Sequence, residues 1–154
     1  MRRFRPRALL ILGRGPLDAQ LRADVARRGL SEKIRFIGFR DDVDRLMPCF
    51  DLLVHPAVME GMGNILLQAA ACEVPIVASA AGGIPEVVRD GVNGRLVPPR
   101  DVQALADAMI ELLSDAERRR RMGVAGRRLV EAEFSIDDMV EAYLRVYREH
   151  VPRA

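Results

Sequence analysis

Short, mostly apolar segments that alternate with helical segments are the feature that most constrains the fold of this chain. The apolar segments cover residues 8–12, 34–37, 51–55, 76–78 and 95–97. Each is far shorter than the roughly 20 residues of a membrane span and is bounded by turn residues, which indicates strands. The run at 8–12 is expected to be a buried strand. Strands that alternate with helices predict an α/β fold with a mostly parallel, doubly wound sheet. Its ligand is expected beyond the carboxyl ends of the strands.

Composition indicates one globular domain over residues 1–154. The chain is 49% hydrophobic and 30% charged, and a domain of this length buries roughly 70% of the surface of its unfolded chain. Its two cysteines, Cys49 and Cys72, lack the spacing of a metal site. With no apolar leader in the sequence, they predict a cytoplasmic protein, for which a peripheral contact with a membrane is the alternative.

The charge pattern argues against a nucleic-acid partner. The net charge is +2, aromatic residues make up 5% of the chain and tryptophan is absent, whereas single-strand binders interleave basic residues with stacking rings. The run Arg118–Arg121, with Arg127 and Arg128, would suit a nucleic-acid or anionic-membrane surface. The acidic residues near this run are Glu111, Asp115, Glu117 and Glu131. We therefore expect a solvated helix face there.

The segment 55–69 holds the strongest candidate site. It places the Glu60 carboxylate and two glycines, Gly61 and Gly63, between a strand end and a helix start. Glycine permits the close approach of a ligand, and a helix N-terminus presents unpaired N–H groups and a positive dipole end. The pattern predicts an anion site, most simply for phosphate. The alternative is an ordinary glycine-rich turn in which Asn64 is merely an exposed N-cap.

Two further glycine turns follow predicted strands. They are GRGP at 13–16 and AGGIPE at 81–86. Because the carboxyl ends of parallel strands meet at one edge of a sheet, three such turns favour a ligand spread across that edge. Asn64 and Gln68 are four residues apart and are expected on one face of their helix.

Seven short motifs follow one another from residue 8 towards the C-terminus. They are GRGP at 13–16, FIGF at 36–39, DLLVHP at 51–56, EGMGN at 60–64, ACEVPIVA at 71–78, GGIPE at 82–86 and GVNGRLVPP at 91–99. Their order closely resembles the C-terminal domain of retaining GT-B glycosyltransferases of the family 4 or "group 1" type. The resemblance implies a Rossmann-like three-layer domain with a mostly parallel sheet that ends in C-terminal helices. It also implies a nucleotide-sugar donor as ligand.

The resemblance implies roles for individual residues. Glu60 is expected as the catalytic residue that contacts hydroxyls of the donor sugar, and backbone amides of Gly61 to Ile65 are expected to hold the sugar and diphosphate. Phe39 and Arg40 occupy the turn that contacts the nucleobase, although Phe39 is equally compatible with a core aromatic. The donor-binding residues expected on this basis are Gly13, Gly15, Gly38, Phe39, Arg40, Gly61, Met62, Gly63, Asn64, Ile65 and Gln68. No metal or other cofactor is expected.

Three features depart from the family pattern. Gln68 replaces a glutamate that binds the ribose hydroxyls, and the loss of a charged acceptor is expected to weaken binding by roughly 1 kcal/mol. Glu73 stands where the family commonly has glycine. The Gly-Arg turn and Lys-Gly pair that neutralise the donor diphosphate have no match, since the sole lysine, Lys33, precedes a strand. We therefore expect a truncated chain that lacks its first strand–helix unit and the N-terminal acceptor domain.

The leading hypothesis is the donor-binding domain of a retaining, metal-independent glycosyltransferase that moves a sugar from a nucleotide diphosphate to an acceptor. The alternatives are a non-catalytic nucleotide-binding or scaffold module that needs a partner chain and, less favoured, a GT-B-like sugar-nucleotide epimerase. The isolated chain is expected to be inactive because the acceptor domain is missing. Apolar positions cover a broad face of the last helix, at 135–150, so self-association through an exposed interdomain surface is expected.

Overall fold

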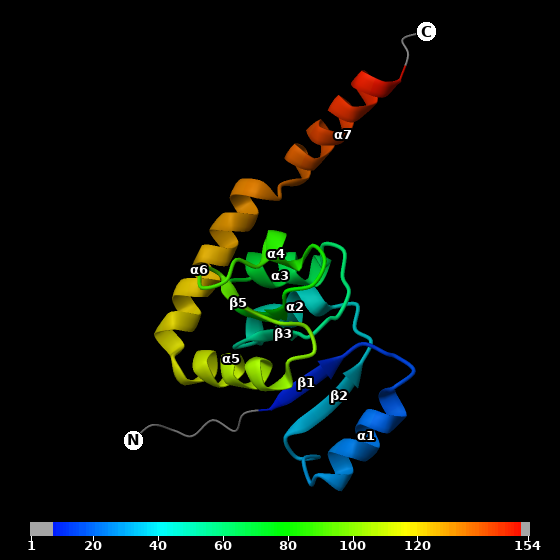
Figure 1. Ribbon diagram of the computed structural model, residues 1–154, viewed down its shortest axis with the longest axis vertical. Coiled ribbons are helices and arrows are strands. Elements are labelled where there is room, and N and C mark those ends of the chain that lie inside the picture. Colours follow the sequence, from blue (N-terminus) through cyan, green and yellow to red (C-terminus); the bar gives the residue numbers. More distant parts are fainter. Residues whose placement is uncertain (1–7, 152–154) are drawn as a thin grey trace. The chain divides into compact units, whose positions relative to one another are not determined.

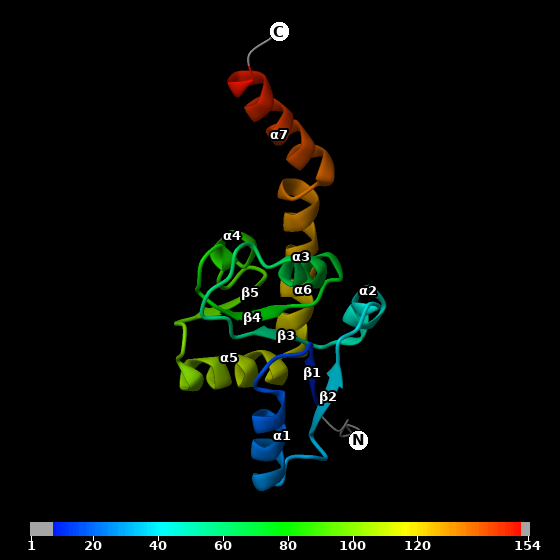
Figure 2. The ribbon, with the colours of Figure 1, turned by 90° about the vertical axis from the view of Figure 1, so that its right-hand side faces the viewer.

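The computed structural model describes residues 8–151, which form two compact units. The first unit ends at Val43 and the second begins at Asp44. Figures 1 and 2 show the helices and strands of each unit in two views. Every strand pair in both units is parallel, and helices alternate with the strands, which confirms the predicted parallel α/β fold. The described strands form two sheets, one in each unit, where the sequence predicts a single sheet.

The first unit is one strand–helix–strand crossover. β1 (Leu9–Leu12) leads through α1 (Asp18–Arg27) to β2 (Ile34–Gly38), which pairs with β1 in parallel. At the carboxyl end of the pair, the Gly13 amide donates a hydrogen bond to the Gly38 carbonyl at 2.8 Å. The turns that leave the two strands are therefore joined by their backbones.

Strands of the first unit are half-buried, so the prediction of a buried strand at residues 8–12 is wrong. Leu9 is 41% exposed, and α1 has no buried residue. The reason is that a sheet of two strands is too narrow for one helix to cover it fully. α1 contacts β2 through the Arg22 guanidinium, which lies 4.5 Å from the centre of the Phe36 ring.

The second unit contains a parallel sheet of three strands. These are β3 (Leu53–His55), β4 (Ile76–Ser79) and β5 (Gly94–Val97), in the order β3-β4-β5. All four residues of the central strand β4 are buried, while β3 is half-buried. Burial on both faces requires the continuous apolar run that the sequence shows at β4.

The helices that follow β2 have the predicted periodicity. They are α2 (Val43–Leu46), the 3-10 helix η1 (Met47–Cys49), α3 (Asn64–Ala71), α4 (Ile84–Val87), α5 (Val102–Ser114), α6 (Ala116–Glu133) and α7 (Ile136–His150). Side-chain oxygens of Asp101, Asp115 and Ser135 accept backbone N–H bonds at the starts of α5, α6 and α7. Such caps satisfy donors that a helix end leaves unpaired.

The hydrophobic core of the second unit joins its sheet to α5 and α6. Its buried residues include Val77, Val97, Ala108, Leu112 and Met122. Each fully buried aliphatic side chain contributes roughly 1.5–3 kcal/mol. The core therefore fixes the central strand, and with it the carboxyl end of the sheet.

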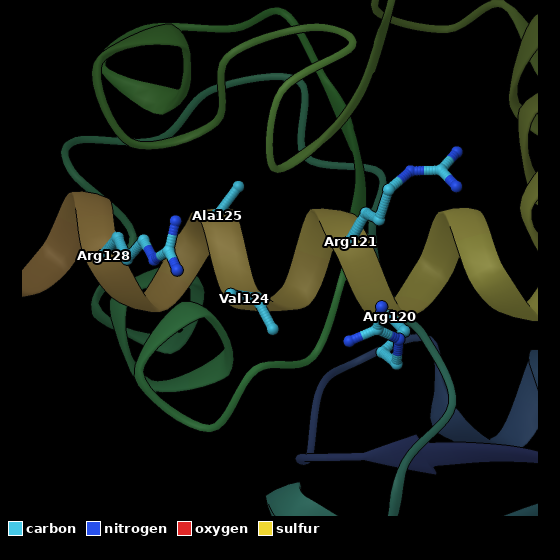
Figure 3. A pocket seen from close by; sticks show the side chains of 5 residues that line it. All are labelled: Arg120, Arg121, Val124, Ala125 and Arg128. Carbon is cyan, nitrogen blue, oxygen red and sulfur yellow. The ribbon is translucent and has the colours of Figure 1, made fainter.

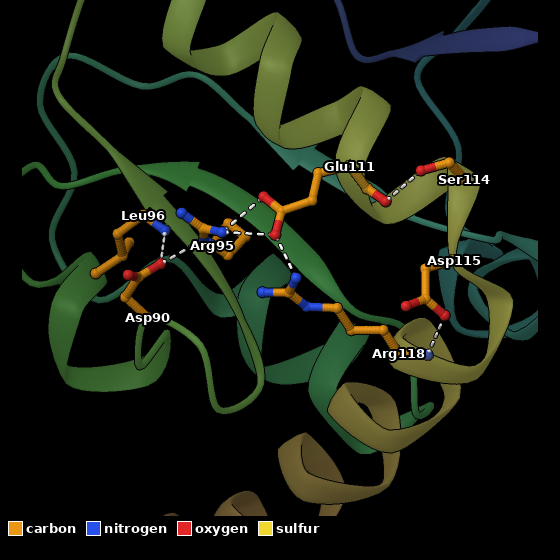
Figure 4. A network of polar contacts seen from close by, with 7 residues as sticks. All are labelled: Asp90, Arg95, Leu96, Glu111, Ser114, Asp115 and Arg118. Atoms are coloured by element: carbon orange, nitrogen blue, oxygen red, sulfur yellow. Dashed lines mark hydrogen bonds and ion pairs between the residues drawn. The ribbon is translucent and has the colours of Figure 1, made fainter.

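A network of ion pairs ties β5 to α5 and α6 at the edge of this core (Figure 4). The Arg95 guanidinium lies 2.9 Å from the Asp90 carboxylate and 2.6 Å from that of Glu111, and Glu111 also pairs with Arg118. Asp90 additionally accepts from the Leu96 amide at 2.9 Å. Glu111 thus connects α5 to β5 and α6 through ion pairs whose side chains are about one-third exposed.

Helix α3 packs closely on α6 through glycines of α6. A Cβ atom at Gly123 would lie 2.0 Å from the Glu73 carbonyl oxygen, whereas one at Gly126 would lie 3.4 Å from the Cβ atom of Ala70. Glu73, which follows α3, has a φ of 59°, in the left-handed region that glycine prefers. This backbone conformation would suit glycine better than glutamate, in line with the glycine that the resemblance leads us to expect at this position.

Helix α7 leaves its apolar face uncovered. It extends beyond α6, away from the sheet of the second unit, in both ribbon views (Figures 1 and 2), and none of its residues is buried. The exposed apolar side chains include Ile136, Met139, Val140, Tyr143, Val146 and Tyr147. The expected exposed surface of the last helix is therefore present.

Candidate functional site

The loop that follows β3 carries the candidate catalytic carboxylate. His55 is the last residue of β3, and the Glu60 side chain returns to it, with Glu60 Oε2 3.1 Å from His55 Nε2. The other carboxylate oxygen, Oε1, accepts a hydrogen bond from the Gly61 amide at 3.2 Å. The two side chains are 22% and 33% exposed, so the carboxylate is held but remains accessible to solvent.

Two glycines after β4 bring a second turn against this loop. The Gly83 amide donates to the Glu60 carbonyl at 3.3 Å. A Cβ atom at Gly82 would lie 1.9 Å from that same oxygen, and one at Gly83 would lie 2.3 Å from the Gly61 carbonyl. The glycine turns predicted at 60–64 and 81–86 are therefore in contact, as expected of two loops at one edge of a parallel sheet.

Helix α3 begins in this loop with unpaired amides. Its N-cap is Gly63, which has a φ of 72° and provides no side-chain cap. The Leu66 amide donates to the Gly63 carbonyl at 2.8 Å, while the amides of Asn64 and Ile65 have no protein acceptor within residues 8–151. The alternative of Asn64 as N-cap is wrong, because the left-handed glycine takes that position. Unpaired N–H groups at a helix start suit an anion.

The two faces of α3 differ as predicted. Leu66 and Ala69 are fully buried, Ile65 is half-buried, and Asn64 and Gln68 are exposed. Met62, in the loop, is 45% exposed. Of the predicted donor-binding residues on α3, Asn64 and Gln68 therefore lie on its exposed face.

The remaining predicted donor-binding residues lie in the first unit. Gly13 and Gly38 are joined by their backbone hydrogen bond, and the Gly15 carbonyl accepts from the Asp18 amide at 3.2 Å. Phe39 is 67% exposed, so its interpretation as a core aromatic is wrong. It follows β2 directly, where the backbone turns sharply at Gly38, which has a φ of 70°.

Arg40 forms an ion pair with Asp42 that was not predicted from the sequence. Its guanidinium donates to the Asp42 carboxylate, with Nε 2.7 Å from Oδ1. This hydrogen bond, together with the charge of Arg40, lowers the pKa of Asp42 below its usual value. His55 was likewise not assigned a role, because a spacing of five residues across a loop gives no periodic signal. Pro56 and Gly61, two residue types that are common where a chain bends, are the only sequence hint that the chain folds back.

A separate shallow pocket of about 520 Å³ lies on α6 (Figure 3). Arg120, Arg121 and Arg128 surround Val124 and Ala125 there, and none of the predicted donor-binding residues lines it. Glu117 lies 2.9 Å from Arg120 and 3.8 Å from Arg121. A further pair joins Arg127 to Glu131 at 2.8 Å. The predicted solvated helix face is confirmed for Arg120 and Arg121, which are exposed and pair with Glu117. It is wrong for Arg119, whose side chain is 17% exposed and donates to the Leu112 carbonyl at 2.7 Å.

Within residues 8–151, no three His, Cys, Asp or Glu side chains gather as a metal site. No helix in the same range is both long and apolar enough to cross a bilayer.

Known proteins resemble this chain in both sequence and fold. The N-acetyl-alpha-D-glucosaminyl L-malate synthase of Bacillus anthracis is 34% identical over 139 residues, which is 90% of this chain and 36% of that protein. A GDP-mannose-dependent mannosyltransferase of Corynebacterium glutamicum, named as acting on a monoacylated phosphatidylinositol monomannoside, is 38% identical over 143 residues. That match covers 86% of this chain and 36% of the relative.

Solved structures of known proteins are similar to this chain in fold. Anabaena HepE in complex with UDP is 26% identical, with a TM-score of 0.86 over 93% of this chain and 41% of its own. The C-terminal domain of the group 1 glycosyl transferase LpcC from Francisella tularensis is 32% identical. Its TM-score is 0.72, over 79% of this chain and 66% of that domain.

These matches show what share of its relatives' length the chain spans and to which family it belongs. It spans about two fifths of the curated relatives, between 36% and 38% of the first two. The sequence model of the family described as "Glycosyl transferases group 1" matches residues 2–115, well over half of the chain. The carboxylate loop, the glycine turn packed against it and the open start of α3 all lie within that range. This chain belongs to the glycosyl transferases group 1 family.

Proposed function

We propose that this chain is the donor-binding domain of a retaining, metal-independent glycosyltransferase, and that a nucleotide diphosphate sugar binds at residues 60–68. The observation that carries the proposal is the Glu60 carboxylate, held at the carboxyl end of β3 beside the unpaired amides of Asn64 and Ile65. UDP and UDP-glucose are present in structures of the related HepE, and the Corynebacterium glutamicum relative is named GDP-mannose-dependent. Both names support a sugar nucleotide as ligand.

The geometry suits the two parts of such a donor. Carboxylate oxygens only accept hydrogen bonds, so Glu60 can bind hydroxyl groups of a sugar. The start of α3 offers N–H donors and a positive dipole end for the diphosphate. As the glycosidic bond breaks, negative charge develops on the leaving phosphate, and donors already aimed at it stabilise the charge without rearranging.

The acceptor is proposed to bind outside this chain. Because the chain spans about two fifths of its relatives, we propose that an N-terminal acceptor domain or a partner chain completes the active site. In its absence the chain would act as a nucleotide-binding module without turnover. Transfer of sugar by the isolated chain to any acceptor would contradict this part of the proposal.

The proposed function is tested by titrating the ¹⁵N-labelled chain with millimolar UDP-glucose, GDP-mannose and ADP-glucose. We expect amide shifts at Gly61 to Ile65 with at least one of them, and loss of the sugar-dependent shifts in Glu60→Gln. Inorganic phosphate serves as a control for charge alone. Shifts confined to Val124 and Ala125 would place the anion on the arginines of α6 instead, and unchanged spectra with all three donors would reject the proposal.

The exposed side chain of Gln68 gives a second test. It lies on α3 four residues from Asn64 and has no hydrogen-bond partner within residues 8–151. If it meets the ribose, Gln68→Glu adds a charged acceptor and tightens nucleotide binding by about fivefold, since a charge-assisted bond is roughly 1 kcal/mol stronger. Calorimetry with UDP and GDP measures the change. An affinity that is unchanged or weaker would mean that residue 68 does not contact the ribose.

Self-association is proposed for the isolated chain through α7. The first turn of α7 is acidic, with Asp137 and Asp138, and its last turn is basic, with Arg148 and His150. Two copies that pair in antiparallel orientation bring these ends together and cover the exposed apolar face.

Sedimentation measurements test this pairing. A mass rising with concentration towards twice 17.2 kDa is expected, and Tyr143→Glu should hold the chain as a monomer. Tyr143 is 63% exposed in the apolar face, whereas Arg145 lies on the opposite side of the helix by its spacing. Arg145→Glu is therefore the control that leaves the apolar face intact. A wild-type chain that stays monomeric at high concentration would rule out the pairing.

A further inference from the structure

In the hydrogen bond between His55 and Glu60, the chemistry of the two groups decides which is the donor. Glu60 Oε2 lies 3.1 Å from His55 Nε2. An ionised carboxylate cannot donate, so the hydrogen of this bond is carried by Nε2 of His55. His55 is anchored by the sheet, because it is the last residue of β3 and lies in register with the buried Ala78 of β4. The bond therefore runs from a fixed donor to the carboxylate of a loop residue.

His55 is the only side chain that ties the Glu60 carboxylate to the sheet, as far as residues 8–151 show. The second donor to this carboxylate is the amide of Gly61, the next residue in the loop, which moves with Glu60. The neighbouring side chains of the loop give no support, since Val58 is 56% exposed and Met59 is 86% exposed. The Gly83 amide holds the backbone carbonyl of Glu60 and leaves its side chain free to rotate. The orientation of the carboxylate thus depends on His55.

We propose that His55 is a positioning residue that orients Glu60 toward the sugar of the donor. This inference rests on the proposed function of the site. A carboxylate has about four acceptor positions, and the bonds from His55 and Gly61 use one on each oxygen. The positions that remain face away from these donors and can accept a pair of neighbouring sugar hydroxyls. His55 therefore acts on the recognition of the sugar and leaves the recognition of the nucleotide unchanged.

The experiment compares sugar nucleotides with free nucleotides. Calorimetry with UDP-glucose, UDP, GDP-mannose and GDP is carried out on the wild-type chain, His55→Ala, His55→Gln and the exposed-loop control Met59→Ala. In His55→Ala we expect about fivefold weaker binding of the sugar nucleotide that the wild type prefers, the effect of one lost hydrogen bond, and less than a twofold change for its free nucleotide. His55→Gln retains an Nε2–H donor and should restore most of the difference, and Met59→Ala should match the wild type.

A second readout needs no ligand. The Gly61 amide bonds to Glu60 Oε1 only while the carboxylate keeps its orientation, so its proton resonance should move upfield in His55→Ala and return in His55→Gln. A Gly61 resonance that is unchanged in His55→Ala, or equal losses for sugar nucleotides and free nucleotides, would overturn the role of His55. Failure of the wild type to bind any of the four ligands would instead reject the proposed function, and with it a role for His55 toward a sugar.

Discussion

Gly82→Ala is expected to lower the free energy of unfolding by about 3 kcal/mol and to displace the loop that carries Glu60. The added Cβ atom would lie 1.9 Å from the Glu60 carbonyl oxygen, a backbone atom that cannot move alone. Gly82 also has a φ of 53°, which costs a residue with a side chain about 1–2 kcal/mol. Urea denaturation measures the loss of stability, and the Gly61 amide resonance reports the displacement.

Gly91→Ala is the matched control for this prediction. Gly91 has a φ of 76°, so alanine there would have the same backbone strain as alanine at position 82, but its Cβ atom would meet nothing within 4 Å. Its substitution is expected to lower stability by about 1–2 kcal/mol, the effect of the left-handed backbone alone, and to leave the Gly61 resonance in place. Equal losses in the two variants would show that strain alone acts and that the two glycine turns are not in steric contact.

Gly123→Ala is expected to destabilise the second unit by about 3 kcal/mol, although the same change in an ordinary helix position stabilises by up to about 1 kcal/mol. A Cβ atom at Gly123 would lie 2.0 Å from the Glu73 carbonyl oxygen, so α3 and α6 would have to separate. Because α3 begins at the candidate site, the separation should also shift the amides of Asn64 and Ile65. Denaturation and the same amide spectra measure both effects.

Gly126→Ala, three residues along the same helix, is expected not to lower the stability. Its Cβ atom would lie 3.4 Å from the Cβ atoms of Ala70 and Asn93, an ordinary packing distance. The lower backbone entropy of alanine in the unfolded chain should then leave the stability unchanged or raise it by up to about 1 kcal/mol. A destabilisation similar to that of Gly123→Ala would mean that the whole interface between α3 and α6 is too tight for any side chain.

The elements of this fold could be predicted from sequence because each depends on short-range patterns. Apolar runs of three to five residues and helical spacing mark the strands and helices, and Ser135, the first residue of the range predicted for the last helix, caps α7. The charge balance of Arg118–Arg121 was also predictable, since partners such as Glu117 lie within one helical turn. Burial of β1 was not predictable, because it depends on how many strands and helices pack around it.

The candidate site was only partly predictable. The motif order placed Glu60 and the start of α3 correctly, and the contact between the loops after β3 and β4 was foreseen from the rule that parallel strands end at one edge. Asn64 as N-cap was only an alternative suggested by its residue type, and the structure has Gly63, with its left-handed φ, at that position. The bond from His55 to Glu60 depends on the path of the loop between them. No local pattern encodes that path.

The left-handed conformation of Glu73 bears on how this chain tolerates sequence change. The backbone carbonyl of Glu73 lies against Gly123 on α6, so the backbone at position 73 restricts the residue type at position 123, fifty residues away. Glycine at 73 would relieve the backbone strain, while at 123 only glycine leaves room for that backbone. At the contact between these helices, position 73 therefore accepts residues other than glycine, whereas position 123 does not. Sequence variation at the first says nothing about the freedom of the second.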